Sequence, residues 1–255
     1  MPSSNPALSP SYFENEARDA PRTANVMTVN GAVAKTGILT LLLFAAGALS
    51  WSMVHPQTGT EAYNPTYRML FGVGAPLLGL VVGLITCFFP RVSPITAPIY
   101  AALEGLFLGA VSSFVSANPK FEGIVMQAGM LTAGTLIVML TAYAVGLVRA
   151  TPRFALIITV AIMGLLLVKL GSFFLSLGGI DTGLYAGGAI GIGFSILCVG
   201  VAAFTLVLDF DTIDSGARAH APKYMEWYAA FGLMVTLIWL YLELLRLLMQ
   251  LRRSD

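Results

Sequence analysis

The sequence predicts an all-α integral membrane protein, a bundle of seven transmembrane helices. Of its 255 residues, 57% are hydrophobic and only 11% are charged, whereas a soluble globular chain carries about 25% charged residues. The apolar residues form seven long, continuous runs. A helix needs about 20 mostly apolar residues to cross the hydrocarbon and satisfies every backbone group internally. Barrel strands alternate over about 10 residues instead, so we expect helices.

The first 33 residues differ from the rest of the chain. They are rich in Pro, Ser, Asn and Ala, carry mixed charges and contain no apolar run. We therefore expect no cleavable signal peptide and a mobile N-terminal tail over residues 1–33. Residues 34–251 then form one seven-helix transmembrane domain, because no connection between the apolar runs is long enough for a soluble domain.

The seven spans follow from the apolar runs and the breaks between them. Proline or charged residues close most runs, as at His55-Pro56, Pro90-Arg91 and Arg252-Arg253. We expect spans at 35–54, 69–89, 95–117, 123–148, 153–176, 184–212 and 225–250. Three small-residue pairs at GxxxG spacing predict close helix contacts: Gly79 and Gly83, Gly105 and Gly109, Gly187 and Gly191.

The distribution of Lys and Arg in the connections predicts the orientation. With the N-terminus inside, eight basic residues lie on the inner side: Arg18, Arg22, Lys35, Arg91, Arg149, Arg153, Arg218 and Lys223. Four lie on the outer side: Arg68, Lys120, Arg252 and Arg253. We therefore expect a cytoplasmic N-terminus. The two outward C-terminal arginines oppose this arrangement unless one span is re-entrant.

Several classes of function lack their required residues. A net charge of +1 provides no basic surface for nucleic acid. Cys87 and Cys198 form no CxxC motif and behave as small packing residues. The only histidines, His55 and His220, lie beside loops, whereas a metal hydrolase needs clustered His or Cys ligands. The chain has no HExxH, GxSxG or phosphate-binding loop motif, so we expect no enzyme and no cofactor. A proton-coupled transporter stays open, although no convincing inverted repeat is found.

Ionisable residues within the apolar runs are the candidates for function, because a charge in hydrocarbon costs several kcal/mol. Glu104, midway along the third span, is either a cation or proton ligand or a protonated acid that bonds to a neighbouring group. Lys169, deep in the fifth span, either extends its ammonium toward water or pairs with an acid. Both are candidates for tuning the site or lining a pore.

The last two spans hold the remaining acids. Asp209 and Asp211 differ by about 200° around a helix, so only one of them faces a common site. Asp209 directly follows an apolar run, whereas Asp211 is also consistent with a solvated helix end. Glu243 either pairs with Arg246, three residues further on, or joins an acid of the sixth span while Arg246 or Lys169 tunes its charge.

Two carboxylates that meet in a low dielectric share a proton. When ionised, the pair binds a hard cation through its oxygen atoms. When protonated, it releases that cation. Such a pair is a pH-sensitive latch.

The stretches LVLDFDTID and IWLYLELLRLL resemble the two acidic signatures of the transmembrane Bax inhibitor motif family, in its bacterial branch. Asp209 and Ile213 match the spacing of the sixth-span pattern, and Glu243 stands where the family often has Asp. EGLFLGA in the third span and the seven-span layout over 34–251 are also similar. The chain departs from the family pattern in two respects. Glu243 has a longer side chain than the Asp that the family often has, and the second span contains no Arg and is only bordered by Arg68.

The resemblance implies a bundle whose last helix is central and wrapped by the other six. It also implies a pH-sensitive Ca²⁺ leak gated by a latch and metal pair of Asp209 and Glu243, with Asp211 as the fallback for Asp209. About 24 Å of helix separates Trp227 from Glu243, so the two acids meet only if the last helix begins well outside the hydrocarbon.

Two functions are therefore expected. The first is a pH-sensitive leak channel for cations, with Ca²⁺ and protons as partners, in a bacterial inner membrane. The alternative is a regulator that transports nothing and binds other membrane proteins, such as a protease, through its small-residue faces and N-terminal tail.

Overall fold

The computed structural model describes residues 26–54, 65–180, 182–184 and 188–254. Within these residues it contains seven helical spans that are long and apolar enough to cross a membrane, which confirms the predicted fold class. The spans are built from α2 (Val29–Val54), α3 (Pro65–Met69) with η2 (Leu70–Gly74) and α4 (Ala75–Phe88), α5 (Ser93–Ser116), α6 (Ile124–Ala144), α7 (Pro152–Leu177), α8 (Ala189–Arg218) and α9 (Met225–Ser254). The short 3₁₀ turns η3 (Pro90–Val92) and η4 (Pro119–Phe121) join α4 to α5 and α5 to α6.

The second span changes its winding partway along. The π-helical turn η2 lies between α3 and α4, just before Pro76. Proline has no N–H to donate, and its ring clashes with the carbonyl four residues earlier. A local widening of the helix accommodates both effects, so the span continues through the proline.

Helices α8 and α2 each extend about six residues beyond a predicted boundary. Helix α8 continues to Arg218 instead of ending near 212, because the Arg218 guanidinium pairs with Asp214 at 3.1 Å in the last turn, where a cation also interacts favourably with the helix dipole. Asp209 therefore lies more than two turns inside α8. Helix α2 begins at Val29, and Met27 is buried and donates its N–H to the Ala221 carbonyl at 2.7 Å.

The predicted boundary of the N-terminal tail thus comes several residues too late, since 26–33 are already in contact with the turn between α8 and α9. Residues 1–25 of the tail, His55 and Gly187 lie outside the described residues.

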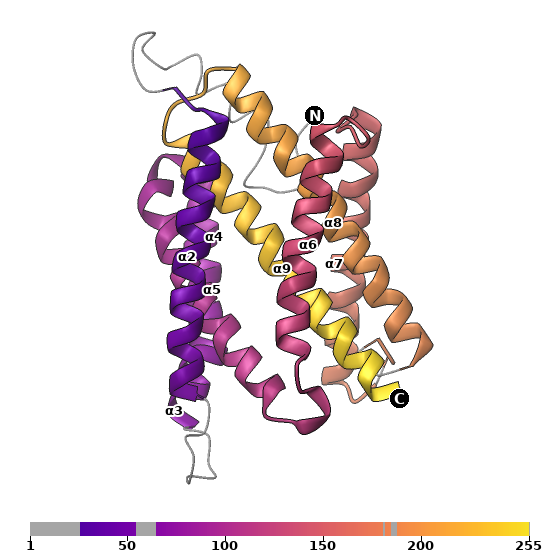
Figure 1. Ribbon diagram of the computed structural model, residues 1–255. Helices are drawn as coiled ribbons and strands as arrows, with labels where there is room; N and C mark the ends of the chain where they lie inside the picture. Colours follow the sequence, from indigo (N-terminus) through magenta and orange to yellow (C-terminus); the bar gives the residue numbers. More distant parts are fainter. Residues whose placement is uncertain (1–25, 55–64, 181, 185–187, 255) are drawn as a thin grey trace.

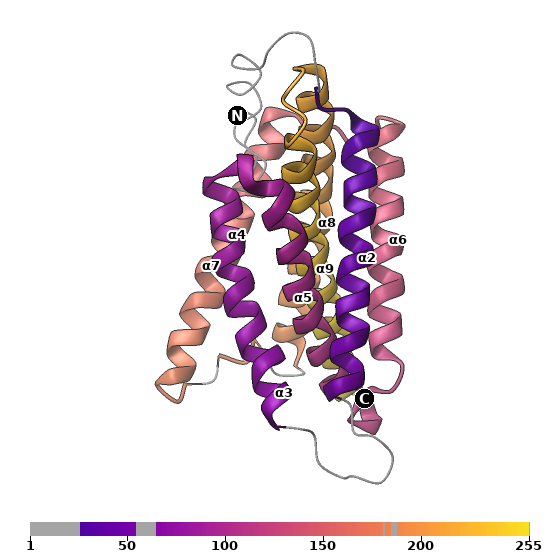
Figure 2. The same cartoon turned by 90° about the vertical axis from the view of Figure 1, so that its left-hand side faces the viewer.

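Helix α9 lies at the centre of the bundle, as the resemblance implies (Figures 1 and 2). It packs against α2, α5, α6 and α8, and Tyr228, Phe231 and Leu240 on it are almost completely buried. Helices α4 and α7 lie further out. Helix α7 packs chiefly against α8, through Ile158 and Leu165. The described helices thus form an inner group around α9 and two outer spans.

Glycines bring α2 and α5 into backbone contact. A Cβ atom on Gly109 would lie 2.1 Å from the Gly47 carbonyl oxygen, and one on Gly105 would lie 2.3 Å from the Leu43 carbonyl oxygen. The close contact predicted for the Gly105–Gly109 pair is therefore present. These two helices form a tightly packed seam beside α9.

Seven spans place the start of α2 and the end of α9 at opposite ends of the bundle (Figure 1). Arg252 and Arg253 are therefore on the side opposite the start of α2, and none of the described spans is re-entrant.

Candidate functional site

Three carboxylates on α8 and α9 are almost completely buried. Glu226 and Asp209 are 0% exposed, and Glu243 is 2% exposed. Glu226 begins α9, Glu243 lies in its second half, and Asp209 lies on the neighbouring α8. Buried charges are costly unless they are paired or hydrogen-bonded, so the contacts of each carboxylate indicate its role.

Glu243 is held by donors from two helices. Lys169 of α7 donates to Glu243 Oε1, and Trp239 donates its indole N–H to the same oxygen at 3.0 Å. Arg246 donates to Glu243 Oε2 at 3.2 Å. The pairing with Arg246 and the contact with Lys169 that the sequence raised as alternatives are therefore both present.

The Glu243 cluster, consisting of Glu243, Lys169, Arg246 and Trp239, has one acid and two bases. The side chains of Lys169 and Arg246 are 23% and 30% exposed, so the cluster is accessible only from the side of its cations. Cys198 of α8 lies within its electrostatic range. The ion pair with Lys169 ties the outer helix α7 to the central helix α9.

The structure does not bring Asp209 to Glu243, so the predicted latch is not formed. Ser195 of α8 donates to Gln250 of α9 at 2.6 Å, which fixes the register of this antiparallel pair. Both distances are measured along the helix axes, from the level of the Ser195–Gln250 hydrogen bond toward the turn between α8 and α9. Asp209 lies about 21 Å along α8, whereas Glu243 lies only about 10 Å along α9. The two carboxylates therefore differ in depth by about 10 Å. The family resemblance identified two acids on neighbouring helices, but it did not predict how α8 and α9 are aligned along their axes.

The fallback residue Asp211 also lies away from Glu243. It accepts a hydrogen bond from the Tyr143 hydroxyl of α6 at 3.2 Å and faces a pocket between α6 and α8. As the spacing predicted, Asp209 and Asp211 occupy different faces of α8, and the buried one is Asp209.

Glu104 is buried between α4 and α5. A Cβ atom on Gly79 would lie 2.7 Å from Glu104 Oε1, so the carboxyl group occupies the space left by that glycine. Tyr100, one turn earlier on α5, packs edge-on against Phe231 of α9 at 4.9 Å between ring centroids. Glu104 thus lies in the opposite half of the bundle from Lys169 and does not join the Glu243 cluster.

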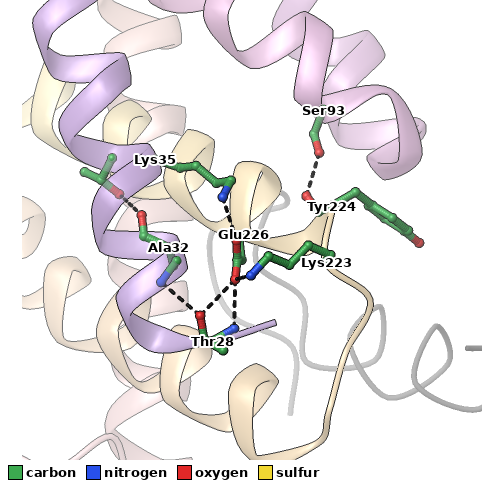
Figure 3. Close-up of polar contacts among 9 residues, drawn as sticks. Thr28, Ala32, Lys35, Ser93, Lys223, Tyr224 and Glu226 are labelled. Carbon is green, nitrogen blue, oxygen red and sulfur yellow. Dashed lines mark hydrogen bonds and ion pairs between the residues drawn. The ribbon is translucent and has the colours of Figure 1, made fainter. Parts of the chain in front are cut away.

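Glu226 makes the most complete set of contacts, and sequence reasoning did not identify it (Figure 3). Its Oε1 accepts hydrogen bonds from the Thr28 N–H and hydroxyl, both at 3.0 Å. Lys223 donates to Oε1 at 2.8 Å, and Lys35 donates to Oε2 at 2.7 Å. We call these four residues the Glu226 clasp. A Cβ atom on Gly31 would lie 2.0 Å from Glu226 Oε1.

The clasp connects the first and last spans. Thr28 caps α2 by accepting the Gly31 N–H at 3.0 Å and at the same time donates to Glu226. Nearby, Ser93 at the start of α5 donates to the Tyr224 carbonyl at 3.1 Å (Figure 3). Glu226 lies among the aromatic residues Tyr224, Trp227 and Tyr228 in the sequence. Its partners lie up to 198 positions away, so no local pattern identified it.

The predicted metal pair of Asp209 and Glu243 is not assembled. No group of three or more His, Cys, Asp or Glu side chains that could hold a metal ion occurs in the described part of the chain. The described residues hold buried carboxylates in ion pairs at Glu226 and Glu243.

Comparison with known proteins gives a family match. A model of the family described as Bax inhibitor 1 like matches residues 5–253, nearly the whole chain. No curated protein matches. No solved structure matches.

Proposed function

The chain belongs to the Bax inhibitor 1 like family, and from that premise we propose that it is a pH-sensitive cation leak channel with Ca²⁺ as its ion. We propose further that its latch is the ion pair between Glu243 and Lys169, in place of a pair of acids. Seven apolar spans and the family together establish a membrane protein of the Bax inhibitor type. The channel, its ion and its latch are the proposal.

The observation that carries the proposal is the position of Glu243. This carboxylate is 2% exposed in the central helix, and it contacts Lys169 of the outer helix α7. With Glu243 and Asp209 both buried, neither acid is accessible to a hydrated ion. This supports assigning the conformation to a closed state.

Proton binding to Glu243 would remove the only negative charge in the cluster. Lys169 and Arg246 would then face each other as like charges in a low dielectric, where their repulsion is several times stronger than in water. Trp239 and Cys198 also lie beside Glu243, and neither carries a charge that could replace it. Acidification should therefore release Lys169 and raise the leak.

The packing of α7 indicates which part moves. Ile158 and Leu165 of α7 form an apolar cluster with Cys198, Val201 and Leu208 of α8, and the Lys169–Glu243 ion pair joins α7 to the central helix. Without it, a limited apolar contact holds the helix, and we propose that α7 swings outward. The move would uncover α8 next to Asp209, whose carboxylate would attract a cation.

Location and orientation are part of the same proposal. The excess of Lys and Arg on one side supports a cytoplasmic N-terminus, which places the Glu226 clasp at the cytoplasmic end and the Glu243 cluster in the opposite half. The bacterial branch and the inner membrane stay predictions.

The test is Ca²⁺ flux in proteoliposomes that contain the full chain and a trapped Ca²⁺ indicator, measured in steps from pH 8 to pH 5. We expect the wild-type leak to rise as the pH falls. Glu243→Gln imitates the protonated acid, so it should leak at pH 8 as the wild type does at pH 5 and lose most of its pH dependence. Glu122→Gln neutralises an exposed loop acid and should behave like the wild type.

Flux equal to that of protein-free liposomes at every pH, in the wild type and in Glu243→Gln, would reject the channel. Cross-linking in native membranes would then test the alternative function, a regulator that transports nothing. A stoichiometric membrane-protein partner, together with the absence of ion flux, would favour that function.

A further inference from the structure

A polar pocket of about 490 Å³ opens where α6 and α8 end and α7 begins. Its ionisable and hydroxyl-bearing lining residues are Tyr143, Arg149, Thr151, Asp211, Asp214 and Arg218. The volume lies within the range of about 300–1,000 Å³ typical of small-ligand sites. The pocket is separate from the Glu243 cluster and from the Glu226 clasp.

The charges in this pocket are only partly paired. Asp214 and Arg218 neutralise each other at 3.1 Å. Asp211 accepts a hydrogen bond from the uncharged Tyr143 hydroxyl and forms no ion pair with any residue that the structure describes. Asp211 is therefore left without a direct ion pair, although the Arg218 guanidinium that pairs with Asp214 lies within its electrostatic range.

Arg149 is the corresponding unpaired base. It is exposed and forms no ion pair within the described ranges, and its guanidinium lies 3.5 Å from the position that a Cβ atom on Gly146 would occupy. Gly146 has φ of +73°, which a residue with a Cβ rarely adopts. The pocket therefore presents one unpaired negative and one unpaired positive group, the complement of a zwitterion.

The pocket lies near the ends of three spans, close to a connection between two of them. All its charged residues come from the ends of spans or from the connection between two of them, 145–151. The same connection carries Val145 and Leu147, which are 72% and 80% exposed. Large apolar side chains beside a polar pocket suit an amphiphile, whose headgroup enters the pocket while its acyl chains cover the apolar side chains.

We propose that this pocket binds the headgroup of phosphatidylethanolamine. The phosphate would pair with the Arg149 guanidinium, which suits phosphate oxygens because it offers several N–H donors in one plane. The primary ammonium would donate to Asp211. Phosphatidylcholine has the same net charge, but its quaternary ammonium has no N–H to donate. Phosphatidylglycerol has the phosphate but no amine.

The test is native mass spectrometry of the full chain in lipid-stripped detergent, titrated with the three lipids carrying identical acyl chains. We expect phosphatidylethanolamine to bind about tenfold more tightly than either competitor, the scale of one charge-assisted hydrogen bond. Asp211→Asn, which still accepts the Tyr143 hydrogen bond, should abolish the difference between the ethanolamine and choline lipids. Arg149→Gln should weaken the binding of both lipids by a similar factor.

The controls separate this site from general surface charge. Arg153→Gln removes another exposed arginine nearby and should leave the lipid preference unchanged, while unchanged far-UV circular dichroism shows that the variants fold. Equal binding of the three lipids by the wild type would overturn the proposal, as would tighter binding of phosphatidylglycerol. Displacement of the lipid by equimolar glycerophosphoethanolamine would also overturn it, since the ligand would then be a soluble phosphate.

Discussion

The Glu226 clasp makes the sharpest prediction about stability, because two different substitutions disturb the same contact. Glu226→Gln removes the negative charge and turns an N–H donor toward the Lys35 or Lys223 ammonium. Gly31→Ala leaves every charge in place but adds a Cβ atom 2.0 Å from Glu226 Oε1. Both changes should separate α2 from α9.

The magnitude follows from the contacts. Breaking a buried ion pair by removing one partner costs about 3–5 kcal/mol. Lys35 and Lys223 are 19% and 44% exposed and can turn toward water, so we expect about 2–3 kcal/mol for Glu226→Gln. For Gly31→Ala, an ordinary contact of about 3.5 Å requires the carboxylate or α2 to move by about 1.5 Å, and overpacking of this kind costs about 1–3 kcal/mol.

The assay is thermal unfolding of the full chain in detergent, followed by circular dichroism. A loss of 2–3 kcal/mol corresponds to a drop in Tm of about 5–10 °C for a chain of this size. The matched control is Gly37→Ala, on the same helix with nothing within 4 Å of its added Cβ. It should be neutral or gain up to about 1 kcal/mol in helix propensity. If Glu226→Gln and Gly31→Ala have the same Tm as Gly37→Ala, the clasp does not hold the two helices together.

Two further predictions concern the helices around α9. Gly109→Ala places a Cβ atom 2.1 Å from the Gly47 carbonyl oxygen and should lower the Tm by several degrees. The control Gly129→Ala has open space at its Cβ and should leave the Tm unchanged. Equal Tm values for the two variants would contradict the tight contact between α2 and α5. Tyr241→Phe removes the 2.7 Å hydrogen bond to the Ser112 hydroxyl and should lower the free energy of unfolding by about 1 kcal/mol. Denaturant titration measures this change. An unchanged denaturation midpoint would contradict a stabilising role of the hydrogen bond.

The spans could be predicted from the sequence because each depends on a local property. A run of about 20 apolar residues specifies a membrane helix whatever lies elsewhere in the chain. The boundaries were less well predicted, because capping contacts set them: α8 continues to Arg218 through its pair with Asp214, and the residues before α2 are held by the distant carbonyl of Ala221.

The site was predicted only in part, because it depends on register and on distant partners. Sequence reasoning selected Glu243, Lys169 and Arg246, and the structure joins all three. It paired Glu243 with Asp209 as well, but the antiparallel register sets these acids at different depths. Glu226 was missed because its adjacent residues resemble an ordinary membrane interface.

The most direct test of the central claim is a double-mutant cycle on the Ca²⁺ leak rate at pH 8, using Glu243→Gln, Lys169→Gln and the variant that carries both. If the ion pair is the latch, each single variant raises the leak and the double variant leaks no faster than the faster single one, because both changes break the same contact. If the two effects multiply, or if Lys169→Gln leaves the leak at the wild-type rate, Glu243 does not act through Lys169.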